Sequence, residues 1–302
     1  MWQIDCAIGA AKSAIPFQDQ LRAAKHRLRA PRLHAGHDLV IEGALGHATA
    51  LEKSGTPLAG RDVLEIGSGW FPILPIVLRL AGARRVYLTD AYRLLTPSTL
   101  QLALEHVEAR RERIADGLGI DAEDVAAFTR RTHGLALDVA LDRLGLTYIA
   151  PFRTADMPAV DVAISHTVLE HVPPDTIRTI FSDLARRLRP DGVMLHGVDN
   201  TDHRSHKDPG LGPFDFLRYG DGAWKWLCLH PQDYTNRLRH SEYLRMAQDC
   251  GFEVIYEHRH VDASLIRHVE SLPLAERFCG RPMADLATSW TQFVARPRHP
   301  GP

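Results

Sequence analysis

The sequence predicts an α/β fold in which a mainly parallel sheet is covered by helices on both faces. Short, nearly uninterrupted apolar runs recur through the middle of the chain, and stretches with helical spacing of apolar residues separate them. Strands buried on both faces have this pattern, because neither of their faces meets solvent. A glycine-rich turn, Gly67-Ser68-Gly69, follows the first run, and an acid, Asp90, ends the second. Sheets of this kind bind ligands at the carboxyl ends of their strands.

The composition indicates an ordinary globular protein. The 302 residues allow one large domain or two modest ones, and 45% of them are hydrophobic and 24% charged. Lys and Arg sum to 36 and Asp and Glu to 37, which gives a formal charge of −1. Proteins that coat nucleic acids usually have a clear basic excess. We therefore expect no nucleic-acid partner.

No feature of the chain predicts a membrane, a leader or a disulfide framework. No apolar run approaches the roughly 20 residues of a membrane helix, and the N-terminal stretch lacks a basic leader segment. The four cysteines lie far apart without a Cys-x-x-Cys pair. We expect a cytoplasmic enzyme without membrane contact.

Four regions are expected along the chain. Residues 1–60 should form an N-terminal cap of short helices, the last of them spanning 39–53. Residues 61–200 should form the core, with strands near 62–66, 85–89, 146–150, 160–165 and 193–198 and helices near 72–81, 96–115, 121–131 and 174–189. Pro190-Asp191-Gly192 should end the last of these helices.

The other two regions are residues 201–250 and 251–302. The first should be an inserted helical lid, since seven of the 22 aromatic residues fall within 30 positions there. These aromatics fit the core of a lid and a wall over a substrate equally well, and Arg237 to Arg239 should lie on a solvated face. The second should hold the final strands. The whole sheet should then have about seven strands, the last of them antiparallel.

The turn after the first strand favours one adenosine cofactor over another. An acid at the end of the second strand, Asp90, can accept both hydroxyls of a ribose. A dinucleotide fingerprint needs a small residue three places after its second glycine, but Trp70 and Phe71 lead to Pro72 there. Glu65 is a poor neighbour for phosphates and a good one for a cation. S-adenosylmethionine carries an ammonium and a sulfonium and no phosphate, so it is favoured over NAD.

Four motifs in order resemble those of class I S-adenosylmethionine-dependent methyltransferases. They are Val63-Leu-Glu-Ile-Gly-Ser-Gly69, Val86-Tyr-Leu-Thr-Asp90, Asp161-Val-Ala-Ile-Ser-His-Thr-Val-Leu-Glu-His171 and Leu188-Arg-Pro-Asp-Gly192. Gly69-Trp-Phe-Pro72, Asp199-Asn-Thr-Asp-His203 and Asn236-Arg-Leu-Arg239 are further similar to a bacterial subgroup that acts on small molecules. The resemblance implies a Rossmann-like core with S-adenosylmethionine as cofactor.

Carried over by position, the resemblance implies a set of cofactor-binding residues. Glu65, Gly67, Ser68 and Gly69 would face the methionine end, Asp90 and Ala91 the ribose, Asp156 the adenine, and His166 and Thr167 the sulfonium.

The candidate catalytic residues are His203, Asp199 and His166. His203 follows the fifth strand, beside the expected reaction site, and a neutral imidazole there can take a proton from an acceptor. The alternative is a loop histidine bonded to Asp199 or Asp202. His171 is expected to pack or cap within its own helix, and His196 to be a buried, hydrogen-bonded side chain.

No metal site is expected. Catechol-type O-methyltransferases hold magnesium with an Asp-Asn pair after strand five, which Asp199-Asn200 matches, and an Asp after strand four. His166 stands at that last position, so the set is incomplete.

The sequence thus predicts methyl transfer to a small molecule, with oxygen as the accepting atom, in sugar or secondary-metabolite biosynthesis. An NAD-linked oxidoreductase and a non-catalytic cofactor-binding module of the same fold remain as alternatives. A homodimer is left open.

Overall fold

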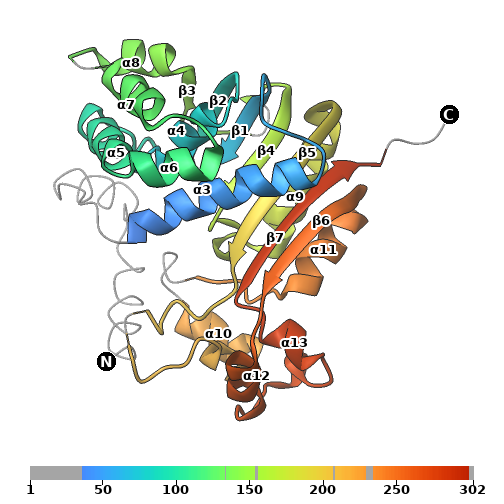
Figure 1. Ribbon diagram of the computed structural model, residues 1–302. Helices are drawn as coiled ribbons and strands as arrows, with labels where there is room; N and C mark the ends of the chain where they lie inside the picture. Colours follow the sequence, from blue (N-terminus) through green and yellow to red (C-terminus); the bar gives the residue numbers. More distant parts are fainter. Residues whose placement is uncertain (1–35, 133, 154–155, 207, 229–233, 299–302) are drawn as a thin grey trace, which may run out of the picture.

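The computed structural model describes residues 36–132, 134–153, 156–206, 208–228 and 234–298. Within them lies a seven-stranded sheet with the order β3-β2-β1-β4-β5-β7-β6 (Figure 1). β7 is antiparallel to β5 and β6, and the pairs from β3 to β5 are parallel. The strands are β1 (Asp62–Ile66), β2 (Arg85–Thr89), β3 (Leu146–Ile149), β4 (Val160–His166), β5 (Leu188–Asp199), β6 (Phe252–His260) and β7 (Trp290–Pro297). The predicted fold class is confirmed.

Helices cover both faces of this sheet. Six contribute to the core on one face: α3 (Gly36–Lys53), α4 (Ile73–Leu80), α5 (Pro97–Ala109), α6 (Arg111–Leu118), α7 (Ala122–Arg130) and α8 (Leu137–Leu144). Two pack on the other: α9 (Pro174–Arg187) and α11 (His240–Asp249). None of the described helices combines the length and apolarity needed to cross a bilayer.

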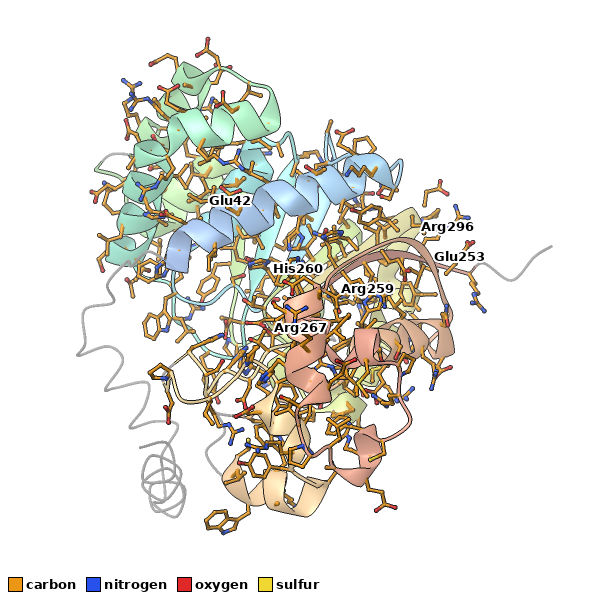
Figure 2. All side chains as sticks on the ribbon, turned by 60° about the horizontal axis from the view of Figure 1, so that its bottom comes forward. Glu42, Glu253, Arg259, His260, Arg267 and Arg296 are labelled. Carbon is orange, nitrogen blue, oxygen red and sulfur yellow. The ribbon has the colours of Figure 1, made fainter. Side chains whose placement is uncertain are left out.

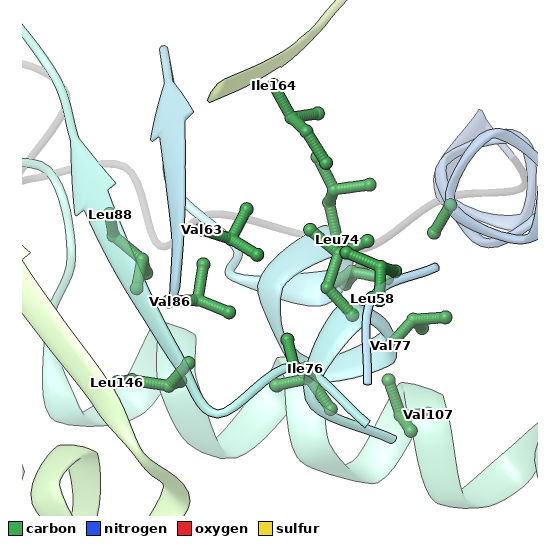
Figure 3. Close-up of a cluster of buried hydrophobic side chains, with 14 of the residues drawn as sticks. Leu58, Val63, Leu74, Ile76, Val77, Val86, Leu88, Val107, Leu146 and Ile164 are labelled. Carbon is green, nitrogen blue, oxygen red and sulfur yellow. The ribbon is translucent and has the colours of Figure 1, made fainter. Parts of the chain in front are cut away.

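The core between β1, β2 and α4 holds the amino-terminal half of the sheet together. Val63, Val86 and Leu88 project from the strands toward Leu74 and Val77 of α4 (Figure 3). Residues 73–78 of this helix are all buried, because α3 and α5 pack against it on the sides that the sheet does not cover. A helix that is apolar all round is expected only in such a place.

The predicted helix over 39–53 is present as α3, which begins three residues earlier. It lies across the sheet and contacts α4, α6, β5 and β7 (Figure 1). The rest of the predicted cap, residues 1–35, lies outside the described residues.

Two boundaries differ from the prediction. The helix expected over 96–115 is two helices, because Arg110 leaves helical geometry and the chain turns so that Ile114 of α6 reaches the core. The turn at 190–192 lies inside β5 instead of before it. Val160 pairs with Leu188 and Val162 with Val193, so three extra residues of β5 form a bulge there.

A third hydrophobic core lies beyond the carboxyl ends of β5 and β6 (lower part of Figure 1). It unites the predicted lid with the connection from β6 to β7, a partner that the sequence did not indicate. Phe214, Phe216 and Trp224 are buried in it, so these aromatics form the core of this layer. Its elements are η3 (Asp215–Arg218), α10 (Asp221–Leu227), α12 (Ala263–Glu270), η5 (Glu276–Phe278) and α13 (Met283–Leu286).

The expected solvated face at Arg237 to Arg239 is wrong, since both arginines are buried. Arg239 donates to the carbonyls of Asn200 at 3.0 Å and Thr288 at 2.6 Å, and its guanidinium lies 5.5 Å from the ring centroids of Phe214 and Phe216. A planar guanidinium can serve several acceptors and stack on rings at once. Arg239 therefore links the segment that follows β5 to the layer built around the third hydrophobic core.

Replacing Arg239 by Met should lower the free energy of unfolding by about 3 kcal/mol, because two buried carbonyls lose their donor. Chemical denaturation measures this. The control is Arg259→Met on the exposed side of β6 (Figure 2), which should change stability by less than about 0.5 kcal/mol. Equal effects of the two substitutions would contradict the joining role of Arg239.

Candidate functional site

Two cavities meet at the carboxyl ends of β1, β2 and β4, and Gly67 and Thr167 line both. The first, of about 380 Å³, is lined further by His37, Val40, Glu65, Ser68, Trp70, Phe71, Ile73, Leu74 and His166. The second, of about 490 Å³, is lined among others by Asp90, Ala91, Phe152, Met157 and His171. Together they form one elongated site with a polar and an apolar end.

The glycine turn after β1 is held by hydrogen bonds to the backbone of β2 and to the side chain of Asp90, the residue that follows it. The Gly67 N–H donates to the Thr89 carbonyl at 2.9 Å, and the Gly69 N–H to Asp90 Oδ2 at 3.0 Å. Gly67 has φ +81°, and a Cβ on it would lie 2.6 Å from a methyl carbon of Val168. Glycine is required here both by the backbone conformation and by the contact with the segment after β4.

Asp90 retains capacity to accept further hydrogen bonds. Its two oxygens accept from the Gly69 and Tyr92 amides, each at 3.0 Å, and each carboxylate oxygen has a second lone pair. It lines the second cavity together with Ala91. This arrangement suits two adjacent hydroxyls of a ligand.

The second cavity has an apolar end. Phe152 and Met157 line it, while Asp156 is exposed and is not among its lining residues. Flat apolar walls of this kind suit an aromatic ring.

Glu65 lines the first cavity beside Ser68. The residue is 4% exposed, its Oε2 has no well-formed hydrogen bond among the described residues, and the Ser68 hydroxyl lies beside the carboxylate. Burial raises the pKa of Glu65 to about 7; the nearby Ser68 hydroxyl opposes this shift and the charge of Asp90 adds to it. A carboxylate in such a place is suited to a cationic ligand.

His166 lies at the end of β4 in a chain of side chains that reaches two distant elements. Its Nδ1 is 3.2 Å from His47 Nε2 on α3, and His47 Nδ1 is 2.8 Å from Gln292 Nε2 on β7. Burial lowers the pKa of His166 to about 4, so its imidazole is neutral at pH 7. Thr167, the next residue, has φ +52°, a strained conformation for a β-branched residue that occurs mostly at functional sites.

Asp199 is the last residue of β5 and His203 follows the strand; the two side chains lie close together, and neither lines the two cavities. His203 Nε2 is 3.3 Å from Asp199 Oδ2. Burial raises the pKa of Asp199, but His203 and the donors of Thr201 outweigh this and lower it to about 2. The His203 ring contacts that of His171, with the centroids 4.9 Å apart.

Of the remaining histidines near the site, one has the position that the sequence predicts and two were not predicted. His196 is fully buried with its Nδ1 2.7 Å from Ser165 Oγ, as predicted. His37 and His47 on α3 and Gln292 on β7 reach the site from far along the chain, and no local pattern marks them. Glu170 belongs to the motif that follows the fourth strand, but nothing in the sequence indicated that its side chain would be buried.

A comparison with protein-family models matches residues 41–257 to a family described as "Methyltransferase domain". A search of the curated proteins finds no match.

Solved structures resemble the chain only distantly. One is the magnesium protoporphyrin IX methyltransferase of Synechocystis PCC 6803 with bound SAH, at 16% identity, a TM-score of 0.46 and 90% coverage of both chains. Another is an S-adenosylmethionine-dependent methyltransferase from Mesorhizobium loti, at 15% identity, a TM-score of 0.45, and coverage of 85% of this chain and 99% of that one. A third is the 1,6-didemethyltoxoflavin-N1-methyltransferase of Burkholderia thailandensis, at 16% identity, a TM-score of 0.43 and coverage of 88% and 84%.

The family match covers more than two thirds of the chain, and it includes the glycine turn, Asp90 and the segment after β4. The chain therefore belongs to the methyltransferase-domain family and is an S-adenosylmethionine-dependent class I methyltransferase.

Proposed function

We propose that the protein transfers the methyl group of S-adenosylmethionine to an oxygen atom of a small acceptor. The observation that carries this proposal is the buried carboxylate of Glu65, one of whose oxygens lacks a well-formed hydrogen bond, in a cavity that adjoins the one lined by Asp90. A ligand with a cationic amino-acid end and a ribose can contact both acids at once. S-adenosylmethionine has both.

The residues fit the cofactor in one direction. Glu65 would bind the ammonium, with Ser68 beside it, and Asp90 and Ala91 would hold the ribose. Gly67 and Gly69 would let the backbone approach the ligand, and the adenine would lie between Phe152 and Met157 instead of against Asp156. The sulfonium would then lie near His166 and Thr167, where the two cavities meet.

The methyl transfer itself is an in-line displacement. A lone pair of the acceptor oxygen attacks the methyl carbon, and the carbon–sulfur bond breaks with its electron pair going to sulfur. Alignment and exclusion of water are the main tasks of the protein, since the sulfonium is already a good leaving group. His166 is neutral at pH 7, so its imidazole would not repel the positively charged sulfonium.

His203 is our candidate for the group that accepts the proton of the acceptor hydroxyl. Asp199 lies beside its imidazole and can stabilise the imidazolium that forms. A small acceptor of sugar or secondary metabolism suits a chain with a formal charge of −1 better than RNA does, because phosphates require basic side chains.

Transfer of a labelled methyl group from S-adenosylmethionine to a pool of small hydroxylated compounds tests the proposal. Asp90→Ala should raise the KM for S-adenosylmethionine about a hundredfold, because two charge-assisted hydrogen bonds are lost. His203→Ala should lower kcat by about a hundredfold or more without changing that KM. Binding without transfer to any acceptor would favour a non-catalytic module.

The affinity for S-adenosylmethionine should depend on pH through Glu65. Its pKa of about 7 means that the carboxyl is protonated below pH 7 and ionised above it. The ammonium of the cofactor stays charged up to about pH 8. The Kd measured by calorimetry should therefore fall about fifteenfold between pH 5.5 and pH 7, in proportion to the ionised fraction.

Glu65→Gln is the matched control for this pH dependence. The variant should bind weakly and with the same Kd across the range. A wild-type protein whose Kd does not change with pH would show that Glu65 does not bind the ammonium.

A further inference from the structure

Three side chains beside the proposed active site form a cluster, and the proposed function gives them no common role. The described part of the chain contains one group of His, Cys, Asp or Glu residues that could share an ion: Glu170, His171 and His203. One ligand atom of each lies within 4.8 Å of the other two. Glu170 and His171 belong to η2 (Leu169–His171) just after β4, and His203 follows the neighbouring β5.

Glu170 is the buried acidic side chain of this cluster. The residue is 3% exposed, no side chain donates to either carboxylate oxygen among the described residues, and the groups that stabilise its charge are backbone groups of Glu170 itself and of Asp199. Buried carboxylates are normally paired, hydrogen-bonded or bound to a metal, since an isolated buried charge is very unfavourable. The two imidazoles lie close enough to share a cation with it.

The two histidines are oriented as metal ligands are. His171 Nδ1 lies 2.9 Å from the Tyr234 carbonyl oxygen, which can only accept, so Nδ1 carries the proton and Nε2 the free lone pair. The Asp199 carboxylate lies 3.3 Å from His203 Nε2. Metal-bound histidines typically bond a carbonyl or a carboxylate through their other nitrogen, which fixes the ring and its tautomer.

We propose that Glu170, His171 and His203 bind a divalent transition-metal ion. Two imidazoles and one carboxylate are a donor set for ions such as Zn²⁺ or Mn²⁺, whereas Ca²⁺ and Mg²⁺ prefer oxygen ligands alone. The site differs from the Asp-Asn arrangement considered for Asp199 and Asn200, because its three ligand side chains are Glu170, His171 and His203.

The position of the ion gives it a role that rests on the proposed function. His171 also lines the cavity that contains Asp90, so the ion lies next to the cofactor site. Three protein ligands leave a position for an acceptor oxygen. A bound ion would lower the pKa of an acceptor hydroxyl, so that the hydroxyl would lose its proton to solvent and its oxygen would attack the methyl carbon as the carbon–sulfur bond breaks with its electron pair going to sulfur. With the ion bound, His203 is a ligand and no longer the base.

The test is a calorimetric titration of chelator-treated, dialysed protein with Zn²⁺ and with Mn²⁺. Wild type should bind one equivalent of at least one of these ions in the described cluster. Glu170→Gln and His171→Ala should each weaken this binding at least tenfold, and His258→Ala, which removes an exposed histidine of β6, should not. S-adenosylmethionine affinity and the thermal midpoint of the metal-free proteins report whether each variant is folded.

The outcomes separate this proposal from the proposed function. Absence of binding in wild type, or equal affinity in the cluster variants and His258→Ala, would overturn the metal site, whatever S-adenosylmethionine does. Metal binding that depends on Glu170 and His171 supports the site even if no methyl transfer is found. Activation of transfer by the ion in wild type, lost in Glu170→Gln, would support its role at the acceptor.

Discussion

The contact between Gly67 and Val168 is the constraint on which the site depends. The turn after β1 and the segment after β4 approach so closely that a single added Cβ would overlap a valine methyl group. This contact brings the two cavities together at Gly67 and Thr167. Thr167, in its strained conformation, then directs the chain into η2, where Glu170 and His171 lie. The cofactor site and the proposed metal site are therefore parts of one backbone arrangement.

Close packing of α3 against the sheet has a similar effect on the other side of the site. A Cβ on Gly43 would lie 2.1 Å from the His166 ring, and one on Gly197 would lie 2.7 Å from His47. These glycines allow His47 to sit between His166 and Gln292. The amino-terminal region thus helps to set the orientation of a side chain at the predicted reaction site.

The sequence was most informative where structure is determined locally. The buried strands and the glycine turn have short sequence patterns that follow from backbone geometry. Asp90 directly follows β2, the strand that pairs with β1 in the sheet. His47 and Gln292 could not be predicted, because 245 positions separate them and only the packed sheet joins them. Arg239 was misjudged for a related reason, since its carbonyl partners come from two distant segments. Asp156 followed a family pattern, whereas Phe152 and Met157 line the cavity.

The most direct test of the account is a crystal structure with S-adenosylhomocysteine bound. The account predicts the ligand ammonium within hydrogen-bond distance of Glu65, both ribose hydroxyls on Asp90, and the sulfur beside His166 and Thr167. A ligand bound in the reverse direction, or outside the two cavities, would contradict it.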